Sequence, residues 1–211
     1  DGLSALKQSH GVLRQILKAA VLDGRLIRNA AEGVSLPRTK PKEKTALTLV
    51  QLRALAKECG EFQTLVILAG TTGMRWGEIA ALQCKDVSLL NKTLYVGKAI
   101  STGLKGEKVL GGTKTHQNRT IPFSKELLPA LTLLIENKNP ESHLFQMPGY
   151  GTLEYNNFMT RYFRPALERC NLQGVGFHSL RHTTASLLIS QGTPITTVSK
   201  ILGHASTQMT L

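Results

Sequence analysis

Residues 71–78 read Thr-Thr-Gly-Met-Arg-Trp-Gly-Glu, and they lie between helical patterns predicted over 61–73 and 76–82. Arg75 therefore follows a glycine at a helix junction, and Glu78 comes one helical turn later. At this spacing we predict that the Glu78 carboxylate holds the Arg75 guanidinium in place. The alternative is an ordinary surface ion pair, which contributes well under about 1 kcal/mol.

Helical patterns also occupy most of the remaining chain. Apolar residues at intervals of three and four predict helices over 3–26, 49–59, 125–135, 153–170, 179–190 and 195–202. Short β-rich stretches, separated by a glycine-rich basic turn at 103–112, are found at 93–96, 99–100 and 119–123. This order predicts an α+β fold that is predominantly helical, with a small three-stranded antiparallel sheet.

A basic, proline-containing segment divides the chain. We predict a linker over residues 37–46, where two prolines favour an extended backbone. Residues 47–211 then form the main domain. Residues 1–36 are too short to bury both faces of two helices, so we expect them to be the C-terminal helices of a helical domain. The alternative is an extension packed on the main domain.

The composition indicates a polyanionic partner. The 26 Lys and Arg residues against 14 Asp and Glu residues leave a net charge of +12, which favours nucleic acid first and an acidic membrane surface second. No apolar run is long enough to span a membrane.

The three cysteines, Cys59, Cys84 and Cys170, are odd in number and widely spaced, so a disulfide framework is not predicted and a reducing compartment is expected. The sequence does not begin with Met, and we expect it to start inside a longer reading frame.

Two further motifs contain histidine. The run His-Ser-Leu-Arg-His at 178–182 places His178 and Arg181 on one face of a helix start. His178 and His182 have the i, i+4 spacing of half a zinc motif, but no Glu follows His178, so no metal site is predicted. His204 directly follows a predicted helix and a glycine; alone it would be interpreted as a capping or core histidine.

Taken in chain order, Arg75, Lys114, His178, Arg181 and His204 resemble the active-site series of the tyrosine recombinases, also called the phage integrase family. The flanking residues are similar as well, in the runs Thr-Gly-Met-Arg-Trp-Gly-Glu-Ile, Thr-Lys-Thr-His-Gln-Asn-Arg-Thr-Ile-Pro, His-Ser-Leu-Arg-His-Thr and Ile-Leu-Gly-His. The resemblance begins near residue 45 and implies the family's catalytic fold for 47–211. Residues 1–36 resemble the last helices of its DNA core-binding domain.

The resemblance implies site-specific cleavage and rejoining of DNA strands through a covalent 3′-phosphotyrosine, with no metal and no cofactor. Attack on phosphorus builds negative charge on the non-bridging oxygens, which a metal-free site must neutralise with preplaced donors. Arg75 and Arg181 would form that clamp, and His204 would add a third donor. His178 would accept a proton from the nucleophile. Lys114 would protonate the departing 5′ oxygen, with Glu78 orienting Arg75 rather than reacting.

The implied partner is double-stranded DNA at attachment or recombination sites. On that DNA the chain is expected to form a homotetramer. The free protein is expected to be a monomer in the cytoplasm of a bacterium or a phage-infected host. Through Lys44 the chain holds nine basic against four acidic residues, and the remainder holds seventeen against ten, so both parts suit DNA. Candidate DNA-contacting residues are Arg38, Lys40, Lys42, Lys44, Lys105, Lys108 and Arg119.

In this family the nucleophilic tyrosine follows the Gly-His pair by about nine or ten residues, which lies just beyond Leu211. We therefore expect the printed sequence to end shortly before it. The tyrosines that are present do not match this position: Tyr95, Tyr150, Tyr155 and Tyr162.

Alternative interpretations remain open. The chain could be a DNA-binding regulator that keeps the phosphate pocket without the tyrosine. Residues 179–190 and 195–204 could form a helix-turn-helix. A type IB topoisomerase has similar chemistry, but the small size and the basic linker speak against it. A nucleotide-binding loop at residues 111–115 is dismissed, because the required glycine spacing is missing.

Overall fold

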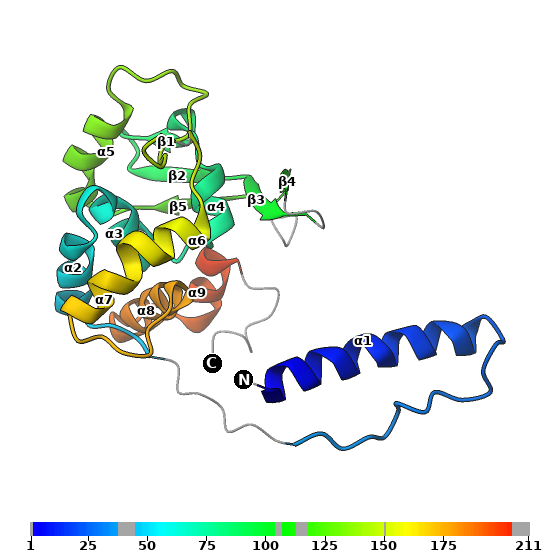
Figure 1. The fold of residues 1–211 in the computed structure, drawn as a ribbon. Coiled ribbons are helices and arrows are strands. Elements are labelled where there is room, and N and C mark those ends of the chain that lie inside the picture. The colour runs from blue at the N-terminus through cyan, green and yellow to red at the C-terminus, as the bar shows by residue number, and fades with distance from the viewer. Residues whose placement is uncertain (1, 38–44, 104–106, 113–117, 150, 204–211) are drawn as a thin grey trace. The chain divides into compact units, whose positions relative to one another are not determined.

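The computed structural model describes residues 2–37, 45–103, 107–112, 118–149 and 151–203 (Figure 1). The chain forms two compact units, residues 1–43 and residues 44–211. Each unit is described by itself. Among the described residues, no helix combines the length and the apolar character needed to cross a membrane.

The first unit consists of one long helix and a returning segment. Helix α1 spans Gly2–Leu22, and Gly24 with a φ of 70° follows its end. Residues 1–36 were expected to contain two helices, but residues 26–34 form bends and turns. Asn29 is the reason, because its side-chain oxygen accepts from the backbone of Ala31 and its amide donates to the carbonyl of Arg14 in α1. These side-chain bonds replace the backbone bonds of a helix.

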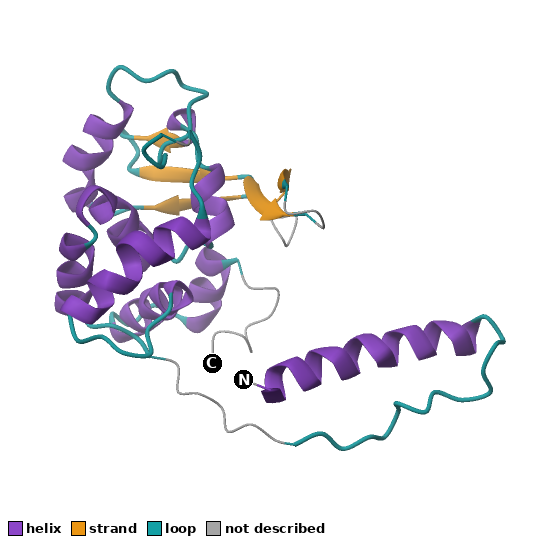
Figure 2. Ribbon diagram, in the orientation of Figure 1, coloured by secondary structure: helices purple, strands orange, loops and turns teal. Residues whose placement is uncertain are grey.

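The second unit is mainly helical (Figure 2). Its α-helices are α2 (Leu49–Glu58), α3 (Gln63–Thr72), α4 (Trp76–Ala81), α5 (Leu128–Ile135), α6 (Tyr155–Phe158), α7 (Arg164–Arg169), α8 (Phe177–Ser190) and α9 (Ile195–Leu202). Short 3₁₀ turns cover Gly60–Phe62, Cys84–Asp86 and Lys125–Leu127, and a π-helical turn at Met159–Phe163 joins α6 to α7. The predicted helices of this unit are thus all present, and the one predicted over 153–170 contains this π turn.

The strands form two separate sheets. β1 (Val87–Ser88), β2 (Thr93–Val96) and β5 (Arg119–Pro122) make a three-stranded antiparallel sheet in that order. β3 (Lys98–Thr102) and β4 (Lys108–Gly112) form a hairpin that projects from the body of the unit (Figure 1). The predicted small three-stranded antiparallel sheet is thus confirmed, but one of its strands differs: β1 belongs to it, whereas the predicted stretch 99–100 lies in the separate hairpin. β1 is too short for its alternation to be recognised, and the glycines of β4 were taken for a turn.

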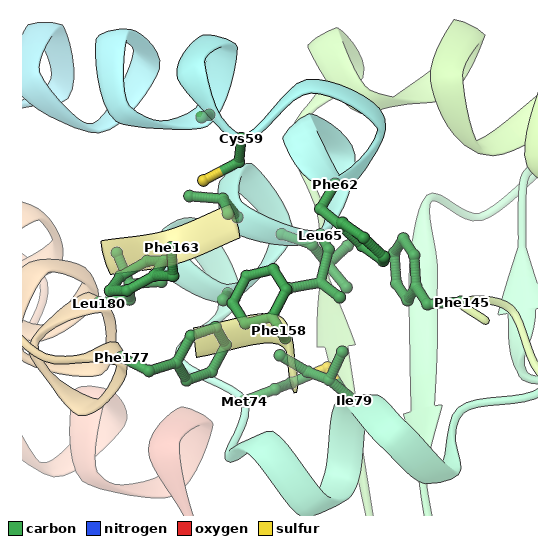
Figure 3. Packing of buried hydrophobic residues seen from close by; sticks show 14 of the residues in the cluster. Cys59, Phe62, Leu65, Met74, Ile79, Phe145, Phe158, Phe163, Phe177 and Leu180 are labelled. Carbon is green, nitrogen blue, oxygen red and sulfur yellow. The ribbon is translucent and has the colours of Figure 1, made fainter. Parts of the chain in front are cut away.

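Aromatic rings fill the centre of the second unit. Phe158 is fully buried, and it lies between Phe62 and Phe177 (Figure 3), with ring centroids 5.3 and 5.8 Å from its own. The ring centroid of Trp76 lies 5.1 Å from that of Phe158. Trp76 and Phe177 also contact each other edge to face, with centroids 5.1 Å apart. Since Trp76 begins α4 and Phe177 begins α8, the core fixes the first turns of these two helices relative to each other.

Close backbone packing positions α4 on the hairpin. A side chain at Gly77 would place its Cβ 2.4 Å from the carbonyl oxygen of Ile100 in β3. Only glycine permits this approach, because the obstructing atom belongs to the backbone. The hairpin that leads to Lys114 is therefore seated directly against the helix that follows Arg75.

Candidate active site

Arg75 occupies the short gap between α3 and α4. Gly73 ends α3 in the left-handed conformation with a φ of 66°, and Arg75 has the extended backbone of a residue that caps α4. The Glu78 carboxylate reaches back, and its Oε2 accepts from the backbone nitrogen of Arg75 at 2.8 Å. This hydrogen bond is the one that the N3 glutamate makes in a capping box. Residues within one helical turn therefore orient the Arg75 side chain.

Glu78 is the only carboxylate in this network among the residues that the structure describes. Its side chain is buried, and Oε1 accepts from Arg75 Nη1 at 3.0 Å. Burial by itself would raise the pKa of Glu78, but the hydrogen bonds and positive charges of Arg119 and Arg75 outweigh it and lower this pKa. Glu78 is therefore an anion at neutral pH, held between two guanidinium groups.

Arg119 is the second partner of Glu78. Its Nη1 and Nη2 donate to the two carboxylate oxygens at 3.0 and 2.8 Å, and its Nε donates to the carbonyl of Ile201 at 3.0 Å. The prediction that Arg119 contacts DNA does not fit this position, since its side chain is only 10% exposed. The sequence contains a signal for this position: Arg119 is two residues before the buried Ile121 in β5, and residues at i and i+2 of a strand lie on the same, here core-facing, side.

Arg181 projects from α8 into the same region. It is buried, with 4% of its surface exposed, and donates to the carbonyls of Gly73 and Leu202. Arg75 Nη2 donates to the carbonyl of Gly203 at 2.9 Å. Both guanidinium groups thus lie at the carboxyl ends of α3 and α9, where unpaired carbonyls carry partial negative charge.

The charges of this cluster, formed by Arg75, Glu78, Arg119 and Arg181, do not cancel. Burial, followed by the charge of Arg75, lowers the pKa of Arg181 to about 9, so the group remains cationic at neutral pH. Arg75, Arg119 and Arg181 carry three positive charges against the one negative charge of Glu78, which leaves a net charge of +2 on these described groups. A buried excess of guanidinium charge favours an anion with several acceptor oxygens, such as a phosphate.

His178 lies in the first turn of α8, close enough to Arg181 and Arg75 for their charges to act on it. Its side chain remains exposed in part, but desolvation of the rest lowers its pKa from the usual 6.5, and the positive charges of Arg181 and Arg75 lower it further. The imidazole is consequently neutral at neutral pH and able to accept a proton. The structure brings Arg75, Glu78, Arg181 and His178 together.

Several predicted site residues lie outside the described part of the chain: Lys114, His204, Arg38, Lys40, Lys42, Lys44 and Lys105. Lys108 is described. Its Nζ lies 2.7 Å from a carboxylate oxygen of Glu154 and donates to Thr152 Oγ1 at 2.6 Å. It thereby ties β4 to the segment before α6, a contact that sequence reasoning missed because the partners are far apart in the chain.

The two helices of the alternative helix-turn-helix interpretation build this pocket. α8 supplies Arg181 and His178, and the last carbonyls of α9 accept from the two arginines. Val198 and Leu202 of α9 are fully buried against Ala185 of α8.

Comparison with known proteins agrees with this arrangement. Residues 45–211 match the family model described as the phage integrase family. The chain belongs to this family. It is 31% identical to the integrase of Escherichia phage 186, over 82% of this chain and 45% of that protein. It is 25% identical to a XerC-like tyrosine recombinase of Caldanaerobacter subterraneus, over 97% of this chain and 60% of the relative. This integrase-family chain thus spans about half the length of the curated relatives it matches.

Solved structures confirm the predicted predominantly helical catalytic fold of the tyrosine recombinases. The integrase of transposon Tn1549, solved in complex with a circular intermediate DNA, superimposes with a TM-score of 0.83 at 19% identity, covering 99% of this chain and 74% of that chain. A lambda integrase dimer bound to a core site gives a TM-score of 0.69 at 19% identity, covering 99% of this chain and 58% of the other.

The position of His178 leads to a pH prediction for this integrase-family chain. In the free protein we expect its imidazole to titrate below pH 6.5, because burial and two nearby guanidinium groups disfavour the charged form. The measurement is an NMR titration of the histidine ring protons, with His178→Gln to assign the signal. A midpoint above 6.5 would contradict the position given to Arg75 and Arg181.

Proposed function

We propose that this member of the phage integrase family is a site-specific DNA recombinase that cleaves and rejoins strands through a 3′-phosphotyrosine without a metal. The observation that carries the proposal is the cluster in which Arg75 and Arg181 hold an excess of positive charge at the carboxyl ends of α3 and α9. The activity is proposed for the whole protein, and the proposal includes a nucleophilic tyrosine beyond Leu211.

The arginines account for the electrostatic part of the reaction. When an oxygen attacks the phosphodiester, negative charge accumulates on the non-bridging oxygens of phosphorus. The guanidinium groups of Arg75 and Arg181 are preplaced and partly shielded from water, so they need little reorganisation to stabilise that charge. His204, which follows Gly203 in the chain, is proposed as a third donor to the same oxygens.

Proton transfer is assigned to His178 and Lys114. A tyrosine oxygen forms the bond to phosphorus while the bond to the 5′ oxygen breaks. His178 accepts the tyrosine proton, which its lowered pKa allows at neutral pH. Lys114 donates a proton to the departing 5′ oxygen. Rejoining is the reverse, with the 5′ hydroxyl attacking the phosphotyrosine, so that the bond energy is conserved and no cofactor is needed.

The proposed partner is double-stranded DNA, and the proposed assembly on it is a homotetramer that dissociates to monomers. The net charge of +12 supports a DNA partner, as do the neighbouring integrase structures solved on DNA. Residues 1–36 are proposed to be the last helices of a core-binding domain, and residues 37–46 a basic linker along the DNA backbone. The proposed location is the cytoplasm of a bacterium or phage-infected host.

A test uses the full-length protein and fragmented genomic DNA from its source, mixed in EDTA and denatured with SDS. We expect a covalent protein–DNA adduct that survives denaturation, disappears after protease digestion and forms equally well without EDTA. Sequencing the captured DNA then gives the recombination site. A protein that binds the fragments but forms no adduct in either buffer would instead be the silent DNA-binding regulator.

A further inference from the structure

We propose that Arg119 is a positioning residue of the pocket, which neutralises Glu78 so that the charge of Arg75 remains available to a phosphate. This inference rests on the proposed function. Arg119 has no place in the series of residues to which the reaction was assigned above. It acts through Glu78, Arg75 and the end of α9 rather than by touching DNA.

The first argument is the sharing of Glu78. Each oxygen of its carboxylate accepts two hydrogen bonds, one from Arg75 and one from Arg119. The Arg119 side chain is 10% exposed and grips both oxygens with its guanidinium, whereas the Arg75 side chain is 24% exposed and reaches Glu78 with a single Nη. Arg119 is therefore the principal counter-charge of Glu78, because its contact is bidentate and better shielded from water.

The second argument is the charge that remains. Without Arg119 the buried carboxylate would have Arg75 as its one cationic partner among these groups, and the net charge of the pocket would fall from +2 to +1. A buried carboxylate must be paired, so Arg75 would turn both of its terminal nitrogens toward Glu78. A guanidinium engaged in that way offers less charge and fewer donors to a phosphate.

The third argument is the end of α9. Arg119 Nε donates to the carbonyl of Ile201, and its guanidinium lies 3.2 Å from the position of a Cβ at Gly203. The carbonyls of Leu202 and Gly203 accept from Arg181 and Arg75. The Arg119 side chain thus holds the end of α9, whose carbonyls accept hydrogen bonds from both Arg75 and Arg181.

The experiment compares Arg119→Met with the wild type, using orthovanadate as a phosphate analogue and the fluorescence of Trp76, the single tryptophan of the printed sequence, which follows Arg75. We expect Arg119→Met to weaken vanadate binding and slow single-turnover cleavage about 10- to 100-fold, with duplex affinity within about threefold. Arg119→Lys should recover part of the loss. Arg53→Met is the control, because Arg53 pairs with the exposed Glu126 at 2.7 Å.

The double variant Arg119→Met/Glu78→Gln separates positioning from folding. If Arg119 acts by neutralising Glu78, removing the carboxylate charge should restore vanadate affinity at least about tenfold over Arg119→Met. The inference would be overturned if the Arg119→Met variant were less stable than the wild type but bound vanadate equally well. Failure of the proposed function would give a different result. The wild type would bind vanadate and Arg119→Met would weaken that binding, but no protein–DNA adduct would form.

Discussion

Arg181→Ala is expected to slow strand cleavage by about a thousandfold or more while changing duplex affinity only a few-fold. The Arg181 guanidinium is buried at the meeting point of α3, α8 and α9, where it donates to the carbonyls of Gly73 and Leu202. Because only 4% of its surface is exposed, Arg181 can contribute little to the affinity for the proposed DNA duplex. It acts on the charge that develops at one phosphorus, so its loss should appear in the rate.

Single-turnover cleavage and duplex binding are measured on the same preparations, and thermal unfolding checks that each variant is folded. Arg181→Lys keeps the charge but loses the planar fork, and we expect it to recover only part of the activity. Arg164→Ala, which removes an exposed arginine from α7, is the matched control and should cleave normally. Cleavage by Arg181→Ala at the wild-type rate would remove Arg181 from the clamp.

Glu78→Ala is expected to lower the free energy of unfolding by about 3–5 kcal/mol, because it removes one partner from a buried charge network. Arg119 and Arg75 would be left facing each other with no carboxylate between them. Urea unfolding at neutral pH measures the change. Glu126→Ala removes an exposed carboxylate that also pairs with an arginine, and it should cost less than about 1 kcal/mol. Equal effects of the two substitutions would contradict the buried network.

The stabilisation by Glu78 should also depend on pH in one direction. Its pKa is lowered in the folded protein, so the contribution is complete above the pKa of the unfolded chain, near 4.5. It is lost as the pH falls through the lower pKa of the folded state. The difference in unfolding free energy between the wild type and Glu78→Gln should therefore shrink below about pH 4.5. A difference that grows on acidification would contradict the ion pairs assigned to Glu78.

Local features of the site could be predicted from the sequence. The three-residue spacing of Arg75 and Glu78 fixes their contact once a helix begins at Trp76, and the apolar periodicity locates α3, α4, α8 and α9. Thr48, a hydroxyl residue directly before an apolar helical pattern, caps α2, where its hydroxyl accepts from the backbone of Gln51. Each of these depends on residues within one or two helical turns.

Interactions between distant segments could not be predicted in this way. Arg119 and Glu78 are 41 residues apart in the chain, and the basic character of Arg119 suggested DNA instead of a buried carboxylate. The ion pair of Lys108 was missed for the same reason, since its partner Glu154 follows β4 by more than forty residues. Sequence patterns report charge and periodicity, whereas the pairing of charges is decided by tertiary packing.

The central claim is that the paired arginines activate a phosphodiester for attack by a tyrosine without a metal. The most direct test is mass spectrometry of the DNA-linked peptide from full-length protein that has reacted in EDTA. The account predicts a tyrosine beyond His204 joined to a 3′-phosphate, with a free 5′ hydroxyl on the other strand end. A link to a 5′-phosphate, a link through another residue, or cleavage that requires a divalent metal would contradict it.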